Sequence, residues 1–216
     1  MWLYLISHRL GNLRGWPGEL QKIKEASAAG CQLIQIRERD LPARLLTQMT
    51  KEAIEVTRST GARVLVNDRL DVALASGADG VHLRSTSLPV DVVRRVRNQR
   101  GLAPFLIGVS THTLTEAQMA EERGATFIVT GPVFSPKSKS IDGPPMGLER
   151  FEKICRRVSL PVFALGGVGR ENYREVMAAG AVGIAAIGLF QVTQGLSALV
   201  SELLGGQQPE SRFPPP

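Results

Sequence analysis

Short apolar runs alternate with amphipathic stretches along almost the entire chain of 216 residues. The apolar runs are nearly continuous and rich in β-branched residues, as expected of parallel strands that are buried on both faces. Eight runs are candidate strands: Trp2–Ile6, Gln32–Ile36, Arg63–Val66, Gly80–Leu83, Phe105–Val109, Phe127–Val129, Pro161–Ala164 and Gly183–Ala186. The pattern therefore predicts a parallel sheet whose strands are joined by long crossovers.

The segments between these runs have the periodicity of amphipathic helices. Several end at a glycine, as at Gly77 and Gly124, and glycine suits the left-handed conformation that closes many helices. The predicted helices are Leu20–Ala28, Leu41–Thr57, Leu70–Ser76, Val90–Arg97, Leu114–Arg123, Leu148–Arg157, Asn172–Ala179 and Phe190–Leu203. Strands and helices thus alternate regularly from one end of the chain to the other.

Eight β/α units in a chain of this length indicate an α/β protein with a compact (β/α)8 barrel, the TIM-barrel fold. A doubly wound open sheet is the alternative, but the GxGxxG fingerprint that commonly follows its first strand is missing. We expect a single barrel domain over residues 1–204. Residues 205–216 show no periodicity, and we predict that they form a disordered tail.

Composition narrows the class of protein further. The net charge of +6 permits nucleic acid or anionic small molecules as ligands. The densest basic run, residues 94–100, has no interleaved aromatic residue and is predicted to be a solvated helix face. No apolar run approaches the roughly 18 residues that span a membrane. We therefore expect small phosphorylated molecules as ligands, and neither nucleic acid nor a membrane; a homo-oligomer stays open.

Only two cysteines occur, Cys31 and Cys155, and neither belongs to a CxxC motif. This count argues against a disulfide scaffold and against a structural zinc site. The apolar start of the chain is followed at once by His8 and Arg9, so it resembles a first strand more than a signal peptide. Together these features predict a cytoplasmic protein.

Glycines follow the last two predicted strands. In β/α barrels the carboxyl ends of the strands build the active site, and the seventh and eighth loops commonly bind phosphate. Gly166, Gly167 and Gly188 occupy these loops. Glycine lets backbone N–H groups and a helix N-terminus approach an anion closely. The sequence thus predicts a phosphate site here; the alternative is that these glycines only serve tight turns.

Cationic side chains follow other strands at the same predicted end of the barrel. Arg37, Arg39 and Lys139 would bring three positive charges to its mouth. They favour a substrate with more than one phosphate group. The alternative is that the two arginines form structural ion pairs with the carboxylates of Glu38, Asp40 or Asp68.

Amide and carboxylate side chains complete this predicted mouth. Gln35 and Asn67 can donate side-chain N–H hydrogen bonds to an anion. Asp68 offers a carboxylate to Mg²⁺, which prefers few protein ligands together with phosphate oxygens. A cofactor of Mg²⁺ is therefore expected.

Six segments of the chain resemble thiamine-phosphate synthase and its sister group, the TenI-type thiazole tautomerases. The likeness extends over nearly the whole barrel, from Leu3 to Gly188, and rests on the order and spacing of the segments. They are QIRERD (35–40), NDRLDVALASGADGVHL (67–83), IGVSTHT (107–113), TGPVF (130–134) with Lys139, PVFALGGV (161–168) and AGAVGIAAIG (179–188).

The resemblance implies a transferase of thiamine biosynthesis that condenses hydroxymethylpyrimidine diphosphate with thiazole phosphate, giving thiamine phosphate and diphosphate. Arg37 and Lys139 would be catalytic, since they would stabilise the charge of the departing diphosphate. By matching positions, the pyrimidine diphosphate would be held by Gln35, Arg37, Arg39, Asn67, Ser110 and Lys139, and Mg²⁺ by Asp68. The thiazole phosphate would be held by Pro136, Lys137, Ser138, Gly167, Ile187 and Gly188.

Several positions depart from the synthase pattern. Ser87 stands where that family has a second metal-binding aspartate, so the Mg²⁺ site is expected to be weakened. Arg84 replaces a glycine and could carry part of the metal's charge. Arg39 replaces a lysine, which keeps the charge and changes its geometry. Pro136 and Ser138 stand at two threonines, and Gly188 at a serine.

These departures leave two alternatives to the synthase, which we take as the leading interpretation. One is a TenI-like thiazole tautomerase; its usual histidine corresponds to Pro132, and His112 is either a substitute base or a helix-start residue bonded to backbone. The other is a non-catalytic protein that binds thiazole phosphate. His82, inside a strand, is expected to be a hydrogen-bonded core histidine.

Overall fold

The computed structural model describes residues 1–9, 15–135, 143–191 and 194–205. Within these ranges eight parallel strands pair in sequence order and close into a barrel, with the eighth strand against the first. The strands are β1 (Trp2–Ile6), β2 (Leu33–Ile36), β3 (Arg63–Asn67), β4 (Gly80–Leu83), β5 (Leu106–Thr111), β6 (Phe127–Thr130), β7 (Val162–Leu165) and β8 (Gly183–Ala186). The predicted TIM barrel is confirmed, and each strand lies within one or two residues of its expected bounds.

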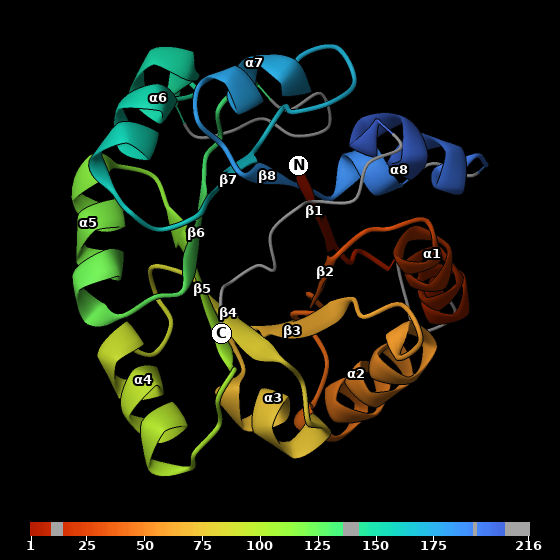
Figure 1. Ribbon diagram of the computed structural model, residues 1–216. Helices are drawn as coiled ribbons and strands as arrows, with labels where there is room; N and C mark the ends of the chain where they lie inside the picture. Colours follow the sequence, from red (N-terminus) through yellow and green to blue (C-terminus); the bar gives the residue numbers. More distant parts are fainter. Residues whose placement is uncertain (10–14, 136–142, 192–193, 206–216) are drawn as a thin grey trace.

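Helices surround the barrel as an outer ring (Figure 1). They are α1 (Trp16–Ala28), α2 (Ala43–Thr57), α3 (Leu70–Ser76), α4 (Val90–Gln99), α5 (Leu114–Arg123), α6 (Gly147–Arg157), α7 (Tyr173–Ala178) and α8 (Leu196–Leu204). None of the helices within the described ranges is long and apolar enough to cross a membrane.

The last helix begins later than the sequence predicted. A short 3-10 turn, η2 (Gly188–Phe190), follows β8, and α8 starts only after Gly195. Gly195 has a φ of 75°, in the left-handed region, so a right-handed helix cannot run through it. The prediction of one helix over Phe190–Leu203 is therefore wrong in its first part.

Two separate apolar clusters follow from the alternation of side chains along the strands. One face of each strand packs against the helices, and the other fills the inside of the barrel. Inside, the rings of Tyr4, Phe127 and Phe163 meet edge to face, with centroids 5.6 to 5.8 Å apart. All three side chains are fully buried, and this aromatic layer fills the barrel interior.

The inward positions become polar toward the carboxyl ends of the strands. Gln35 follows the interior residue Leu33 by two positions, and Asn67 follows Leu65 in the same way. Because side chains two residues apart on a strand share one face, both amides point into the barrel above its apolar layer. The strand pattern itself therefore produces a polar mouth on an apolar floor.

Candidate active site at the barrel mouth

A buried chain of hydrogen bonds joins two predicted ligand-binding residues, Gln35 and Ser110. Gln35 donates from Nε2 to the Tyr4 hydroxyl over 2.9 Å. The Tyr4 hydroxyl lies 3.4 Å from His82 Nδ1, and His82 Nε2 lies 2.8 Å from the Ser110 hydroxyl. Side chains from β1, β2, β4 and β5 thus form one polar relay across the barrel.

The direction of this relay follows from its proton count. Burial, with a smaller contribution from Arg37, lowers the pKa of His82 from 6.5 to about 3, so its imidazole is neutral. Tyr4 accepts from Gln35 and gives its own proton to His82 Nδ1, which leaves the imidazole proton on Nε2. His82 therefore donates to Ser110, and the Ser110 hydroxyl hydrogen stays available to a ligand. The expectation that His82 is a satisfied core histidine is confirmed.

Arg37 is positioned through its backbone by the end of β1. Its N–H donates to the Ser7 hydroxyl over 2.9 Å, and that hydroxyl donates to Glu38 over 2.7 Å. Glu38 is buried and forms an ion pair with Arg9 at 3.1 Å. Burial lowers the pKa of Arg37, and the nearby charges of Arg39 and Arg84 contribute to the shift. The guanidinium groups of β2 and β4 are thus close enough to repel one another.

The alternative that Arg37 and Arg39 form structural ion pairs is wrong for the described residues. The carboxylates of Glu38 and Asp40 pair with Arg9 instead, and that of Asp68 pairs with Arg84. Neither of the two guanidinium groups has an ion pair in the described part of the chain. Arg37 is half-buried and Arg39 is exposed, so both are available to an anion.

Asp68 is held by two side chains from the loop after β4. Arg84 donates to one carboxylate oxygen over 2.5 Å, and the Ser87 hydroxyl donates to the other. Partial burial would raise the pKa of Asp68, but the bonds from Ser87 and Arg84 outweigh it and lower the pKa below its ordinary value. We call Asp68, Arg84 and Ser87 the Asp68 triad.

The residues of the Asp68 triad do not fit a resident magnesium ion. Mg²⁺ is usually bound by one or two carboxylates together with water and phosphate oxygens. Both oxygens of Asp68 already accept hydrogen bonds, and one of the donors is a guanidinium, which repels a second cation. Within the described ranges no three acidic, histidine or cysteine side chains gather as a metal site. Ligation of Mg²⁺ by Asp68 stays a prediction that this geometry does not favour.

The loop after β7 presents Gly167 at the mouth. Gly167 has a φ of 65°, and a Cβ there would lie 2.7 Å from the backbone of Phe134, so the position requires glycine. Asn172 ties the loop together: its side chain donates to the Gly167 carbonyl over 2.9 Å and accepts from the N–H of Gly169 over 2.8 Å. Among the described residues, the N–H of Gly167 has no acceptor, as a phosphate-binding group requires.

Gly188 differs from Gly167 because packing does not require glycine there. A Cβ at Gly188 would meet no described atom within 4 Å, and the residue is exposed. Ile187 precedes it and packs at the edge of the interior cluster. Since β7 and β8 are neighbours, both loops leave the barrel side by side at the same end.

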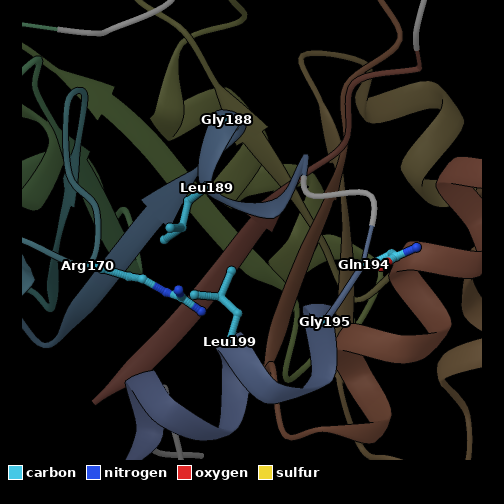
Figure 2. A pocket seen from close by; sticks show the side chains of 6 residues that line it. All are labelled: Arg170, Gly188, Leu189, Gln194, Gly195 and Leu199. Atoms are coloured by element: carbon cyan, nitrogen blue, oxygen red, sulfur yellow. The ribbon is translucent and has the colours of Figure 1, made fainter.

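A pocket of about 310 Å³ adjoins these loops, lined by Arg170, Gly188, Leu189, Gln194, Gly195 and Leu199. Figure 2 shows the side chains of Arg170, Leu189 and Leu199 converging on one space, whereas Gln194 points away from it. Arg170 forms an ion pair with Glu202 of α8 at 3.1 Å. The pocket therefore places a further guanidinium near the eighth loop.

His112 lies at the carboxyl end of β5 and contacts the sixth loop. Its Nδ1 is 2.6 Å from the Gly131 carbonyl, so the imidazole is bonded to backbone beside Pro132. The His112 N–H donates to Glu116 over 2.5 Å at the start of α5. The helix-start role expected of His112 is present, and its Nε2 has no partner among the described residues.

The sixth loop carries predicted residues that lie outside the described ranges, namely Pro136, Lys137, Ser138 and Lys139. Of the others, the structure joins Gln35 to Ser110 and places Arg37 near Arg84, at one end of the barrel. Asn67 is buried next to Asp68, and its amide has no described partner. The sequence pattern did not reveal Tyr4 or Ser7, because their contacts link distant segments. It did not reveal Asn172 either, whose contacts lie within the loop after β7 and depend on the backbone conformation of that loop.

The fold and the groups at its mouth define a class of protein: a (β/α)8 barrel whose strand carboxyl ends carry groups suited to bind anions. The family model described as thiamine monophosphate synthase matches residues 3–190 of the chain. The chain therefore belongs to this family, and the resemblance seen in the sequence is confirmed.

Relatives of known name agree with this assignment. A relative from Geobacter sulfurreducens is 42% identical over 185 residues, which cover 86% of this chain and 84% of its own. The thiamine-phosphate synthase of Moorella thermoacetica is 40% identical over 184 residues, 85% of this chain and 84% of its own. The solved structure of thiamine phosphate pyrophosphorylase from Pyrococcus furiosus has a TM-score of 0.75 and 35% identity, covering 94% of this chain and 97% of its own.

Proposed function

We propose that this protein condenses hydroxymethylpyrimidine diphosphate with thiazole phosphate to form thiamine phosphate. Family membership and the names of its relatives favour this reaction over the tautomerase. The observation that carries the proposal is the separation of two anion-suited groups at one mouth. Guanidinium and amide groups gather at β2, β3 and β4, and glycine N–H groups at β7 and β8.

The chemistry assigns a role to each side of the mouth. The bond between the pyrimidine methylene and the diphosphate oxygen breaks, and its electron pair leaves with the diphosphate. The thiazole nitrogen then forms a bond to the methylene carbon and becomes a thiazolium cation. Arg37 donates hydrogen bonds to the leaving diphosphate, and the available proton of Ser110 supplies another donor. The Gly167 and Gly188 N–H groups hold the thiazole phosphate.

A second candidate function rests on His112. Its imidazole is fixed at the Gly131 carbonyl, beside the proline that occupies the tautomerase histidine position, and its Nε2 has no described partner. This arrangement supports proton transfer on a thiazole carboxylate held by the same phosphate loops. The condensation does not need such a base, so the two functions are separable.

The test is direct synthesis with purified protein. We expect thiamine phosphate and diphosphate to form in equal amounts from the two phosphorylated halves, as measured by chromatography and a diphosphate assay. Arg37→Gln should lower kcat/KM by about 100-fold, since a charged donor to the leaving group is lost. Arg100→Gln removes an equal charge at the carboxyl end of α4, which leads into the start of β5 at the end of the barrel away from the mouth, and should leave the rate unchanged.

The same assays separate the candidates. Conversion of the thiazole carboxylate tautomer without thiamine phosphate synthesis, abolished by His112→Gln, would overturn the synthase in favour of the tautomerase. Binding of thiazole phosphate with no turnover of either kind would leave the non-catalytic binder.

A further inference from the structure

Arg84 contacts the carboxylate of Asp68, the group that was predicted to bind a metal ion at the mouth. Its Nη2 lies 2.5 Å from one Asp68 oxygen, and the Ser87 hydroxyl takes the other. Ser87 also accepts a hydrogen bond of 2.7 Å from the backbone N–H of Arg84. One hydroxyl therefore closes the β4 loop and joins it to the end of β3, which fixes Arg84 on both its backbone and its side chain.

The backbone of Asp68 is shaped for this contact. Asp68 has a φ of 67°, the one positive value of a residue other than glycine among the described residues. Its N–H donates to the His82 carbonyl over 2.8 Å. Such a conformation costs energy and persists where surrounding contacts hold it, commonly at functional sites. The Asp68 triad supplies those contacts.

Arg84 keeps donor capacity for a ligand. A single terminal nitrogen contacts Asp68, so the other terminal nitrogen has no partner in the described part of the chain. The side chain is 36% exposed, which leaves this group open to the mouth. A guanidinium that is held on one side and free on the other is suited to a phosphate oxygen.

The groups that face Arg84 are suited to an anion and not to a metal ion. The charges of Arg39 and Arg84 both act on Arg37 and help to lower its pKa. The nearby carboxylates are already engaged, since Glu38 pairs with Arg9 and Asp71 pairs with Arg69. Asp68 therefore cancels one of three positive charges, and the remainder attracts a diphosphate.

We infer that Arg84 takes the place of a divalent metal at the diphosphate site, so that this protein binds diphosphate without a metal ion. This inference rests on the proposed function, and Arg84 is then a further catalytic residue. As the methylene–oxygen bond breaks and its electron pair stays on the diphosphate, Arg84 donates hydrogen bonds to that oxygen charge. No proton needs to move in this step.

The first test measures pyrophosphate binding by calorimetry, once with excess EDTA and once with Mg²⁺. We expect dissociation constants that agree within about threefold, because no metal bridges protein and ligand. Titration with Mn²⁺, followed by its electron paramagnetic resonance signal, should show no ion bound by the protein alone. Pyrophosphate binding that requires Mg²⁺, or a bound Mn²⁺ ion, would overturn the inference.

Matched variants locate the effect. Arg84→Gln should weaken metal-free pyrophosphate binding by about tenfold or more, whereas Arg69→Gln, which removes an arginine paired with Asp71, should change it less than threefold. The double variant Arg84→Gly with Ser87→Asp restores a pair of carboxylates and should gain a Mn²⁺ signal. Equal losses in the two single variants would contradict the inference.

The wild-type measurements decide the inference even if a variant fails to fold. The wild-type measurements also test the Arg84 inference separately from the proposed function. Metal-free pyrophosphate binding without synthesis of thiamine phosphate would reject the synthase and retain the Arg84 site. Synthesis that depends on Mg²⁺-bridged pyrophosphate would do the reverse.

Discussion

Ser110 and Gln35 show what single residues can and cannot reveal in a sequence. Gln35 was predicted as a ligand-binding residue from its place at the end of a strand, and Ser110 from the resemblance to the synthase family; the side of the strand on which each lies is determined by local alternation. Their connection through Tyr4 and His82 was not predicted, since the bond between these two spans 78 positions. The barrel register creates this contact, and a residue pattern within one strand carries no trace of it.

Acid should destabilise the protein through His82. The folded pKa of His82 lies near 3, below its ordinary value of 6.5, so the unfolded chain binds a proton that the folded protein excludes. The contribution of neutral His82 to the free energy of unfolding is therefore fully present above about pH 6.5. It falls by about 1.4 kcal/mol per pH unit as the pH decreases toward 3. Urea unfolding at about pH 7 and about pH 4.5 measures the difference.

His82→Gln should reduce this pH dependence, although it also lowers stability at neutral pH. His112→Gln removes an exposed imidazole and should retain the wild-type dependence. If both variants respond to acid as the wild type does, His82 is not the responsible group.

At the scale of elements, the strands were predictable and two helix starts were not: α1 begins four residues before the predicted Leu20, and α8 begins after the predicted Phe190. Buried apolar runs between polar loops fix the strands within a residue or two, because a parallel strand inside a barrel has no exposed face. The region before α8 also has helical periodicity, but Gly195 adopts a left-handed conformation that ends any preceding helix. A glycine in the sequence does not tell which sign its φ will take.

The loops after β7 and β8 should differ in how strongly the same substitution destabilises the protein. Gly167→Ala places a Cβ against the Phe134 backbone at a φ of 65° and should lower the free energy of unfolding by about 1–3 kcal/mol. Gly188→Ala adds a methyl group where no described atom lies within 4 Å and should change it by less than about 0.5 kcal/mol. Thermal and urea unfolding test this; similar losses at both positions would contradict the loop geometry.

For the whole molecule, the sequence indicated an anion-binding barrel, and its net charge of +6 is consistent with that. Which cations stay available was not predictable from composition. Arg9, which is buried, forms ion pairs with Glu38 and Asp40, while Arg37 and Arg39 have no ion pair among the described residues. Which arginine pairs with which carboxylate is decided by the segments that the closed barrel brings together.

Salt should weaken diphosphate binding because part of this charge is exposed. Raising NaCl from about 0.05 to about 0.5 M shortens the screening length and should reduce pyrophosphate affinity. Arg39→Gln removes an exposed cation of the mouth and should make the salt dependence shallower. Arg100→Gln, with the same change in charge at the far end of α4, should keep the wild-type slope. Identical slopes in both variants would mean that total charge, and not the mouth, attracts the ligand.

The aromatic layer of Tyr4, Phe127 and Phe163 has a consequence for molecular traffic. Its fully buried rings fill the barrel, so anything that enters the mouth departs through the same doorway. In the proposed reaction two substrates and two products share that single route. Thiamine phosphate that stays bound would block the next thiazole phosphate, so the turnover rate would depend on how quickly the product is released.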